Sequence, residues 1–372
     1  MFRKPNSNEP TPQINPSKLD PILSPEHLKS RRSSSGSTPL RSPDMSYSTS
    51  SHSFLDKIPQ LSLSSSSRSD STTSLTNSCS SSSLAEKMLK WDLAENLYRY
   101  PHELNFETVL GEGTCSTVYL GVLDEQKVAI KKLKPGTNRE FDTDLLIKEA
   151  AYTAKLQSRH TLRLIAITEN PDCLVIEHME GGSLEYFLKA NVAPTGLTLT
   201  FITIALDMIK GLHYLHRNGM IHCDLKSSNV LLDGKLRAKL ADFGFMQRKK
   251  SATSPITSDE EGACGTTAWM APELLRNTDL TPDFRTDIFS LGWLLWSLIT
   301  HKTPFQDLTS KGLELISEMI TRIIAGERGK IPQATPLAYA KLILDCWKEP
   351  HHRLNLDTAL IELKKLKQAK KW

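Results

Sequence analysis

The pattern of apolar residues changes from a strand type to a helix type near Glu180–Gly182, and this change restricts the fold class. Before it, "FETVLGEG", "STVYLGVL", "KVAIKKL", "LRLIAITE" and "CLVIEHM" have the composition and alternation of strands. One helical pattern with acidic residues in its first turn, "DTDLLIKEAAYTAKLQ", lies among them. After it the chain is largely helical, beginning with "TFITIALDMIKGLHYLHRNG". The sequence therefore predicts an α+β fold, with a small strand-rich lobe followed by a larger helical lobe.

The segment before the globular part, residues 1–84, is dominated by serine, proline and threonine. Such a composition cannot bury enough apolar surface to offset its ordering entropy, so we predict a disordered tail. At "LAEKMLKWDLAENLYRY" the composition changes and an imperfect amphipathic pattern begins. The apolar positions of that pattern are Leu84, Met88, Trp91, Leu93 and Leu97. We predict a flanking helix at 85–103 that packs on the following domain, which spans 104–368.

Composition excludes several classes of protein. A net charge of +4, with charged residues making up 24% of the chain, is too balanced to indicate a nucleic-acid-binding protein. The six cysteines are scattered without a CxxC pair, which argues against a zinc site and against a disulfide scaffold. This usage fits a reducing compartment, so a cytoplasmic localisation is expected. No apolar run reaches the roughly 20 residues of a transmembrane helix, and the N-terminus lacks the apolar core of a secretory signal.

Two motifs in the strand-rich part carry groups that can contact phosphate. Gly111 and Gly113 lie between two strand-like runs, so they mark a hairpin, whereas a dinucleotide fingerprint needs a helix after its glycines. Glycine lets a backbone approach a phosphate closely, although a plain hairpin turn fits equally well. Lys131 lies on the next strand, and Glu149 follows 18 residues later in the helix. That carboxylate can orient the lysine against an anionic ligand; two unconnected surface charges are the alternative.

A loop in the helical part, "GMIHCDLKSSNVLLDG", combines groups of complementary chemistry. Asp224 can accept a proton, and Lys226 can neutralise a transferring phosphoryl group. Asn229, together with Asp242 in the "ADFG" run, offers hard oxygen ligands of the kind that magnesium prefers. Further along, "GTTAWMAPE" ends at Glu273, and Arg353 is a candidate buried partner for that carboxylate.

The runs "GEGxxxxV", "VAIK", "HxDLKxxN", "DFG" and "APE" occur in the order and spacing of the eukaryotic protein kinases, and residues 104–368 resemble that family. The runs "DLKSSN", "GTTAWMAPE" and "LDCWKEPHHRL" resemble the tyrosine-kinase-like group of serine/threonine kinases. The resemblance implies a bilobal fold, with a five-stranded lobe and one main helix at 104–179 and a mostly helical lobe at 183–368. It also implies transfer of the γ-phosphate of Mg-ATP to Ser or Thr of protein substrates, with Mn²⁺ able to substitute for Mg²⁺. A role in signalling is implied as well.

The resemblance also assigns roles to residues, position by position. Asp224 corresponds to the catalytic base, Lys226 to the lysine that steadies the γ-phosphate, and Lys131, oriented by Glu149, to the lysine that binds the other phosphates. Asn229 and Asp242 correspond to the magnesium ligands. The ATP-binding positions comprise the glycine hairpin, the walls of the adenine site and the hinge: Leu110, Gly111, Glu112, Gly113, Val118, Ala129, Lys131, Ile176, Glu177, Met179 and Leu231. Thr266 resembles a threonine that contacts the catalytic Asp, and Asp287 an aspartate that braces its loop.

The sequence departs from the family pattern in two informative places. Ser116 replaces the third glycine, a mild change. Cys223 replaces the arginine that in the family binds phosphate on the activation loop, and a thiol cannot form a charge-assisted pair with phosphate. We therefore predict a weak dependence on loop phosphorylation, unless the basic run 248–250 takes over this role. The hydroxyl residues of that loop that are candidate phosphorylation sites are Ser251, Thr253, Ser254, Thr257 and Ser258.

Two other functions stay open at this point. A pseudokinase scaffold that binds partner proteins is disfavoured because every group with a direct chemical role is present. A dual-specificity kinase is disfavoured, although not excluded, by Lys226 and Thr266. The tail is a candidate docking or regulatory segment for other proteins, with acceptors such as Ser24 and Ser42 before prolines; a passive solubilising tail is the alternative.

Overall fold

The computed structural model describes residues 92–113, 116–134, 139–169, 172–190, 196–248 and 266–369. The predicted tail at 1–84, the first part of the flanking segment and the candidate phosphorylation sites of the activation loop lie outside these residues. Within the described part of the chain, no helix combines the length and the apolar character needed to cross a membrane.

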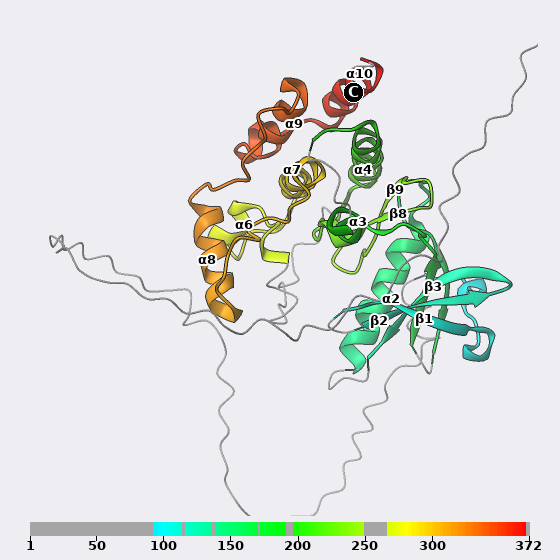
Figure 1. Cartoon of the computed structure of the whole chain (residues 1–372). Helices are drawn as coiled ribbons and strands as arrows, with labels where there is room; N and C mark the ends of the chain where they lie inside the picture. Colours follow the sequence, from blue (N-terminus) through cyan, green and yellow to red (C-terminus); the bar gives the residue numbers. More distant parts are fainter. Residues whose placement is uncertain are drawn as a thin grey trace, which may run out of the picture. The chain divides into compact units, whose positions relative to one another are not determined.

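Five antiparallel strands form one sheet in the order β1-β2-β3-β5-β4. The strands are β1 (Asn105–Glu112), β2 (Ser116–Leu123), β3 (Gln126–Leu133), β4 (Leu164–Thr168) and β5 (Cys173–Glu177). Figure 1 shows β1, β2 and β3 side by side, with the helix α2 (Arg139–Lys155) beside the sheet. The small five-stranded lobe with one main helix is therefore confirmed.

The alternation of β3 explains which of its side chains face α2 and the helical lobe. Successive side chains of a strand point to opposite faces of the sheet. Val128 and Ile130 belong to a small apolar cluster on one face, whereas Ala129 belongs to the main core. Lys131 shares the parity of Ala129, so it lies on the face that also receives Ile147 of α2. The sequence alternation thus directs Lys131 toward α2 and the helical lobe.

The linker between the lobes depends on two glycines. Gly181 donates its N–H to the Leu232 carbonyl at 2.9 Å, and a Cβ at Gly181 would lie 2.9 Å from that same oxygen. Gly182 has φ of +67°, a conformation in which a side chain is strained. The strand β6 (Gly182–Ser183) then pairs with β8 (Val230–Leu232), which pairs with β9 (Ala238–Leu240).

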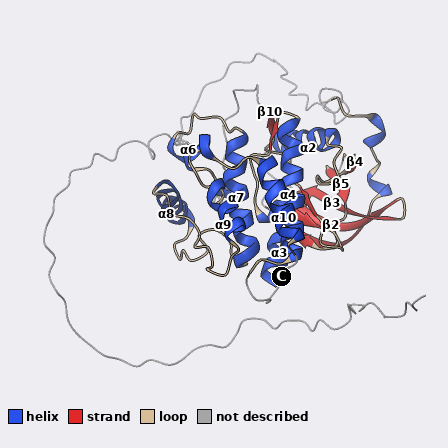
Figure 2. Ribbon diagram, turned by 90° about the horizontal axis from the view of Figure 1, so that it is seen from above, coloured by secondary structure: helices blue, strands red, loops and turns tan. Residues whose placement is uncertain are grey.

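The second lobe is mostly helical, and Figure 2 shows its helices gathered on one side of the domain with the strands of the sheet on the other. Its elements are α3 (Leu184–Ala190), α4 (Leu199–Arg217), β7 (Met220–Ile221), η4 (Ser227–Asn229), β10 (Gln247–Arg248), α6 (Pro272–Arg276), α7 (Phe284–Thr300), α8 (Gly312–Ile324), α9 (Leu337–Cys346), η5 (Pro350–His352) and α10 (Leu356–Gln368). Helix α7 is buried at every residue from Thr286 to Thr300, so it forms the centre of this lobe.

The predicted flanking helix at 85–103 is wrong for its described part, which forms two short 3-10 turns, η2 (Glu95–Leu97) and η3 (Pro101–Glu103). The backbone between them pairs with the edge of the sheet. Tyr98 forms a β-bridge with Ile167 of β4, and the Arg99 N–H donates to the Ile167 carbonyl at 3.0 Å. Pro101 also lacks an N–H for a helical bond. The apolar positions still contact the domain, since Leu93 is buried in the main core and Leu97 packs against it.

Candidate active site

The carboxylate of Asp224 is held by three side chains. Lys226 Nζ lies 2.8 Å from Asp224 Oδ2, and Asn229 Nδ2 donates to the same oxygen at 2.8 Å. Thr266 Oγ1 donates to Asp224 Oδ1 at 3.2 Å and accepts from Lys226 Nζ at 2.9 Å. The Asp224 side chain is only 4% exposed. The residues predicted from the loop motif and Thr266, which is 40 residues away from Lys226, are therefore brought into one cluster.

The backbone of this loop is fixed by Asp287 of α7. Its two carboxylate oxygens accept the N–H groups of His222 at 2.9 Å and Cys223 at 3.0 Å, and Asp287 Oδ2 is also 2.8 Å from His216 Nε2. Cys223 has φ of 66°, a left-handed conformation that is unfavourable for a side chain with a Cβ. The buried carboxylate compensates for this strain by binding both N–H groups of the turn. Asp287 thus braces the loop before Asp224, as its resemblance to the family's aspartate predicted.

The Lys131 ammonium lies between two carboxylates. On β3 its residue is paired with Val118 of β2 and Leu174 of β5, and its Nζ is 2.7 Å from Glu149 Oε2 and 3.5 Å from Asp242 Oδ1. Burial by itself lowers the pKa of Lys131, but Asp242 and Glu149 outweigh it and hold that pKa above its ordinary value. Lys131 therefore stays charged and directed toward the helical lobe.

Asp242 and Asn229 present oxygen ligands near one another. The Ala241 N–H donates to the Asn229 carbonyl at 2.9 Å, which brings the neighbouring Asp242 to the Asn229 loop. Burial raises the pKa of Asp242, but the ammonium groups of Lys131 and Lys226 reverse this effect and hold the pKa below its ordinary value. The Asn229 amide nitrogen is used by Asp224, so its oxygen is oriented away from that carboxylate. An ionised carboxylate and an amide oxygen are a donor set that fits Mg²⁺.

The glycine-rich run forms a hairpin, as predicted. Gly111 pairs with Val118 and Glu112 with Thr117 across β1 and β2, and the Gly113 N–H donates to the Ser116 carbonyl at 2.8 Å. Leu110, directly before Gly111 in β1, is 48% exposed. The hairpin therefore presents backbone and the exposed apolar side chains of Val109 and Leu110.

The apolar residues assigned to an adenine site come from both lobes. Ala129 and Ile176 are cross-strand partners on β3 and β5, and both are buried. Met179 is buried in the same core, against which Val118 and Leu231 are half-buried. The structure thus places all five in or against one apolar cluster.

Glu177, at the end of β5, makes contacts that sequence reasoning missed. Its Oε1 accepts the Arg163 N–H at 2.8 Å and lies 2.6 Å from Lys239 Nζ of β9. The Glu177 N–H donates in turn to the Arg163 carbonyl at 3.1 Å. Lys239 is 62 residues from Glu177, and no pattern in the sequence links the two. This ion pair ties the end of the sheet to the helical lobe.

Cys223, which directly precedes Asp224, has a protonated thiol. Its Sγ donates to the Ile221 carbonyl at 3.6 Å. Burial, followed by the charge of Asp287, raises the pKa of Cys223 well above its ordinary value. The side chain is therefore neutral and cannot take over the charge of an arginine.

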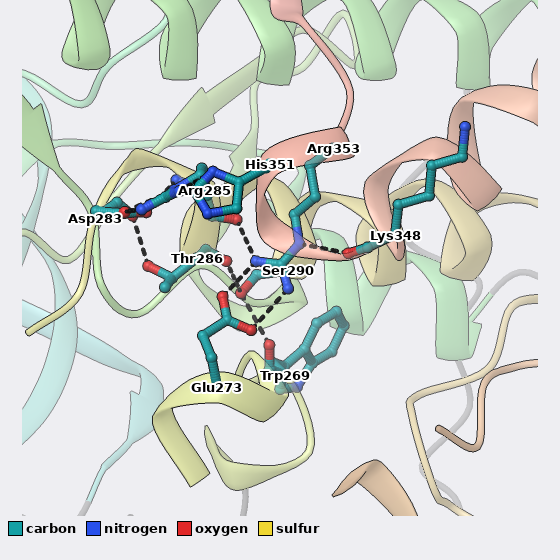
Figure 3. Close-up of polar contacts among 9 residues, drawn as sticks. All are labelled: Trp269, Glu273, Asp283, Arg285, Thr286, Ser290, Lys348, His351 and Arg353. Carbon is teal, nitrogen blue, oxygen red and sulfur yellow. Dashed lines mark hydrogen bonds and ion pairs between the residues drawn. The ribbon is translucent and has the colours of Figure 1, made fainter. Parts of the chain in front are cut away.

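Glu273 and Arg353 form the ion pair predicted from the sequence (Figure 3). Arg353 Nη1 lies 2.5 Å from Glu273 Oε1, and Nη2 lies 2.7 Å from Oε2. Figure 3 shows the guanidinium above the Glu273 side chain of α6, close to the start of α7. Arg353 also donates to the carbonyls of Arg285 at 2.8 Å and Lys348 at 3.0 Å, two contacts that the sequence did not indicate.

The comparison with known proteins now identifies the family. Residues 104–362 match the model of the protein kinase domain. The chain belongs to the protein kinase domain family. The matched range contains every residue of the candidate site, from the glycine hairpin to Arg353.

Several curated relatives of this kinase domain are serine/threonine or dual-specificity kinases by name. The chain is 32% identical over 261 residues to a serine/threonine/tyrosine-protein kinase, HT1, of Arabidopsis thaliana, a match covering 68% of the chain and 64% of the relative. It is 33% identical over 250 residues to the serine/threonine-protein kinase STY46 of the same plant, covering 66% of the chain and 41% of the relative. The dual specificity protein kinase shkB of Dictyostelium discoideum is 32% identical over 284 residues, a match covering 75% of the chain and 41% of the relative. Each match thus spans less than two thirds of the relative's length.

Proposed function

We propose that this kinase domain is catalytically active and transfers the γ-phosphate of Mg-ATP to serine or threonine hydroxyls of protein substrates. The observation that carries the proposal is the Asp224 carboxylate, whose cluster with Lys226, Asn229 and Thr266 is complete. A pseudokinase scaffold would not require this arrangement beside an intact Lys131–Glu149 pair.

Binding of the nucleotide would use charge and backbone from the small lobe. The Lys131 ammonium, oriented by Glu149 at 2.7 Å, would contact the α- and β-phosphates. The glycine hairpin would allow backbone N–H groups to approach the phosphates closely. The buried pair Ala129 and Ile176 would contact the adenine ring.

Asp242 and Asn229 are the residues that would hold Mg²⁺, and Mn²⁺ prefers the same oxygen ligands. When bound, the ion neutralises charge on the phosphate oxygens. On the protein side, the lowered pKa of Asp242 keeps its carboxylate ionised and available for a cation at neutral pH.

Phosphoryl transfer would be assisted by Asp224 and Lys226. Asp224 would orient the substrate hydroxyl and accept its proton while the hydroxyl oxygen bonds to the γ-phosphorus and the bond from that phosphorus to the ADP oxygen breaks. Lys226, 2.8 Å from Asp224, would place its positive charge beside the transferring group. Thr266 keeps both side chains in register by bonding to each of them.

The test is a radiolabelled ATP assay on a peptide library with the full chain. Lys131→Met should lose at least about a hundredfold in kcat/KM, because it removes the phosphate-binding charge. Lys127→Met is the matched control, since Lys127 is exposed on the same strand. It should stay within about twofold of the unaltered chain. Near-normal turnover of Lys131→Met, with Asp242→Asn equally active, would refute the proposal.

Dual specificity is the second candidate, because the names of two relatives include tyrosine or dual specificity. The Lys226–Thr266 contact supports Ser/Thr acceptors. Otherwise identical peptides with Ser, Thr or Tyr as the single acceptor distinguish the two. We expect the Tyr peptide to react at less than about a tenth of the Ser rate; comparable rates would favour dual specificity.

A further inference from the structure

A groove of about 350 Å³ lies where the end of α2 leads into β4. Its lining includes Gln157 and Ser158 after α2, Arg163 and Leu164 at the start of β4, and Lys239 of β9. None of these residues belongs to the phosphate-binding or catalytic groups described above. The groove is thus a separate feature of the domain, formed by elements of both lobes.

Three cations line this groove, with one carboxylate to balance them. Arg159 and Arg163 are both exposed. The Arg159 Nε donates to the neutral ring of His160 at 3.2 Å, and neither guanidinium has a carboxylate partner in the part of the chain that the structure describes. Lys239 is paired with Glu177 at 2.6 Å. The groove therefore carries an excess of positive charge on groups that are free to bind an anion.

The pKa of His160, beside the groove, is affected by the same positive charges. Burial lowers the pKa of His160, Asp207 opposes that shift, and the charges of Lys210, Arg159 and Arg237 lower the pKa further. The buried Asp207 carboxylate is already bound by Arg237 through two bonds of 2.7 and 2.8 Å. It is thus not available to neutralise the arginines of the groove.

We infer that this groove binds the phosphate group of a phosphorylated serine, and that the serine run 78–83 of this chain supplies it. A guanidinium group can bind phosphate oxygens through two parallel hydrogen bonds, and two such groups balance a phosphate monoester, which carries a charge of about −1.5 to −2 at neutral pH. The Ser158 side chain adds a hydroxyl to the lining. A carboxylate would satisfy fewer of these donors and balance only half of the charge.

The direction of the described chain and the length of the segment before it allow this serine run to reach the groove. Tyr98 bridges Ile167 of β4 in parallel, so residues before Tyr98 run back toward Leu164, where β4 begins and the groove lies. Ser83 is nine residues before Asp92, the first residue described, and nine extended residues cover about 30 Å. The run 78–83 has no charged residue, so it gains charge complementarity to the groove only when it is phosphorylated.

Occupation of the groove would affect the end of β5. Lys239 pairs with Glu177, and a phosphate in the groove competes for the same ammonium group. Glu177 would then keep only the Arg163 N–H, and the segment that follows β5 would loosen. Because this segment is part of the proposed nucleotide site, this step rests on the proposed function: the phosphate should weaken nucleotide binding, and nucleotide should weaken phosphate binding by the same factor.

The experiment measures fluorescence anisotropy with the full chain, dephosphorylated beforehand so that its own serines leave the groove free. The probe is a fluorescein-labelled peptide spanning residues 76–87 with phosphoserine at Ser81. It should bind at least about tenfold more tightly than its unphosphorylated form. Arg163→Gln should remove about tenfold of this affinity, because one guanidinium is lost. Its backbone N–H, which binds Glu177, is unchanged by the substitution. Arg217→Gln, an equal change of charge at an exposed position outside the groove, should have no effect.

Equal binding of the two peptides, or equal effects of Arg163→Gln and Arg217→Gln, would overturn the assignment of the groove. Competition by inorganic phosphate at the same concentration as the phosphopeptide would overturn the serine run as its occupant. Calorimetry with ATP then tests the coupling, and saturating phosphopeptide should weaken ATP binding about threefold or more. Since peptide binding is read without nucleotide, a chain that fails to bind ATP would refute the proposed function and leave the result for the groove intact.

Discussion

Replacing Arg353 with alanine should destabilise the helical lobe far more than the loss of an exposed arginine. The Arg353 side chain is 2% exposed, and its guanidinium makes four bonds, two to Glu273 and one each to the carbonyls of Arg285 and Lys348 (Figure 3). These bonds join α6, the start of α7 and the segment around η5, from Lys348 to Arg353. The substitution leaves the Glu273 carboxylate without its cation.

The size of the effect follows from burial on the two sides of the pair. Removing one partner of a buried ion pair costs about 3–5 kcal/mol, because the other charge stays buried. Glu273 is 16% exposed, so water reaches part of its carboxylate and the lower end, about 3 kcal/mol, is the better value. For a domain of this size each kcal/mol lowers Tm by about 2–4 °C, so we expect Tm to fall by roughly 6–12 °C.

The assay is urea unfolding of the full chain, with Arg285→Ala as the matched control. Arg285 is 42% exposed and bonds to Asp283, two residues away, so its removal should cost less than about 1 kcal/mol. A double-mutant cycle of Arg353→Ala with Glu273→Ala isolates the coupling, which should exceed about 1.5 kcal/mol. A cost for Arg353→Ala no larger than that for Arg285→Ala would show that this pair does not hold the three segments together.

Three further predictions concern pH, the cluster around Asp224 and regulation. The folded pKa of His160 is lowered from 6.5, so the unfolded chain takes up the proton first and stability should fall as pH drops below about 6.5; urea unfolding from pH 7.5 to 5 should show this, and His160→Gln should flatten the curve. Thr266→Ala removes the bonds to Lys226 and Asp224 and should lower kcat/KM on a serine peptide about tenfold, whereas Thr266→Ser should restore most of the loss, as steady-state kinetics can measure. Changing the five hydroxyl residues of the activation loop to Ala should lower kcat/KM less than about tenfold, since the neutral Cys223 thiol cannot pair with phosphate; a hundredfold loss with the fold intact would contradict this.

The strands were predictable because their signal is local. Alternation in "STVYLGVL" gave the bounds of β2, Ser116–Leu123, and the pattern of "KVAIKKL" lies within β3. The helix predicted for the flanking segment was wrong for its described part. Its apolar spacing suits a helix, but the Arg99 N–H donates to the carbonyl of Ile167, about 70 residues later in the chain. The spacing of side chains along a segment does not show which distant strand will form hydrogen bonds with its backbone.

The same distinction holds in the site. The lysine and carboxylate of the Lys131–Glu149 pair were predictable because each sits in a recognisable motif. Lys239 lies in no motif, and its pairing with Glu177 depends on how β9 is placed relative to β5. His216, which bonds Asp287 across 71 residues, is likewise found only from the packing of α4 against α7.

The position of the Asp224 carboxylate, the proposed catalytic base, is set by the core of the helical lobe. Cys223, directly before Asp224, adopts a left-handed φ of 66°, which costs about 1–3 kcal/mol for a residue with a Cβ. Two N–H bonds to Asp287 hold that turn, and Asp287 lies on α7, the helix buried at every residue from Thr286 to Thr300. Because α7 cannot shift without disturbing that core, Asp287 holds the turn at Cys223 in a fixed position. The protein itself therefore holds this loop in position, and such preorganisation is what the proposed phosphoryl transfer would require.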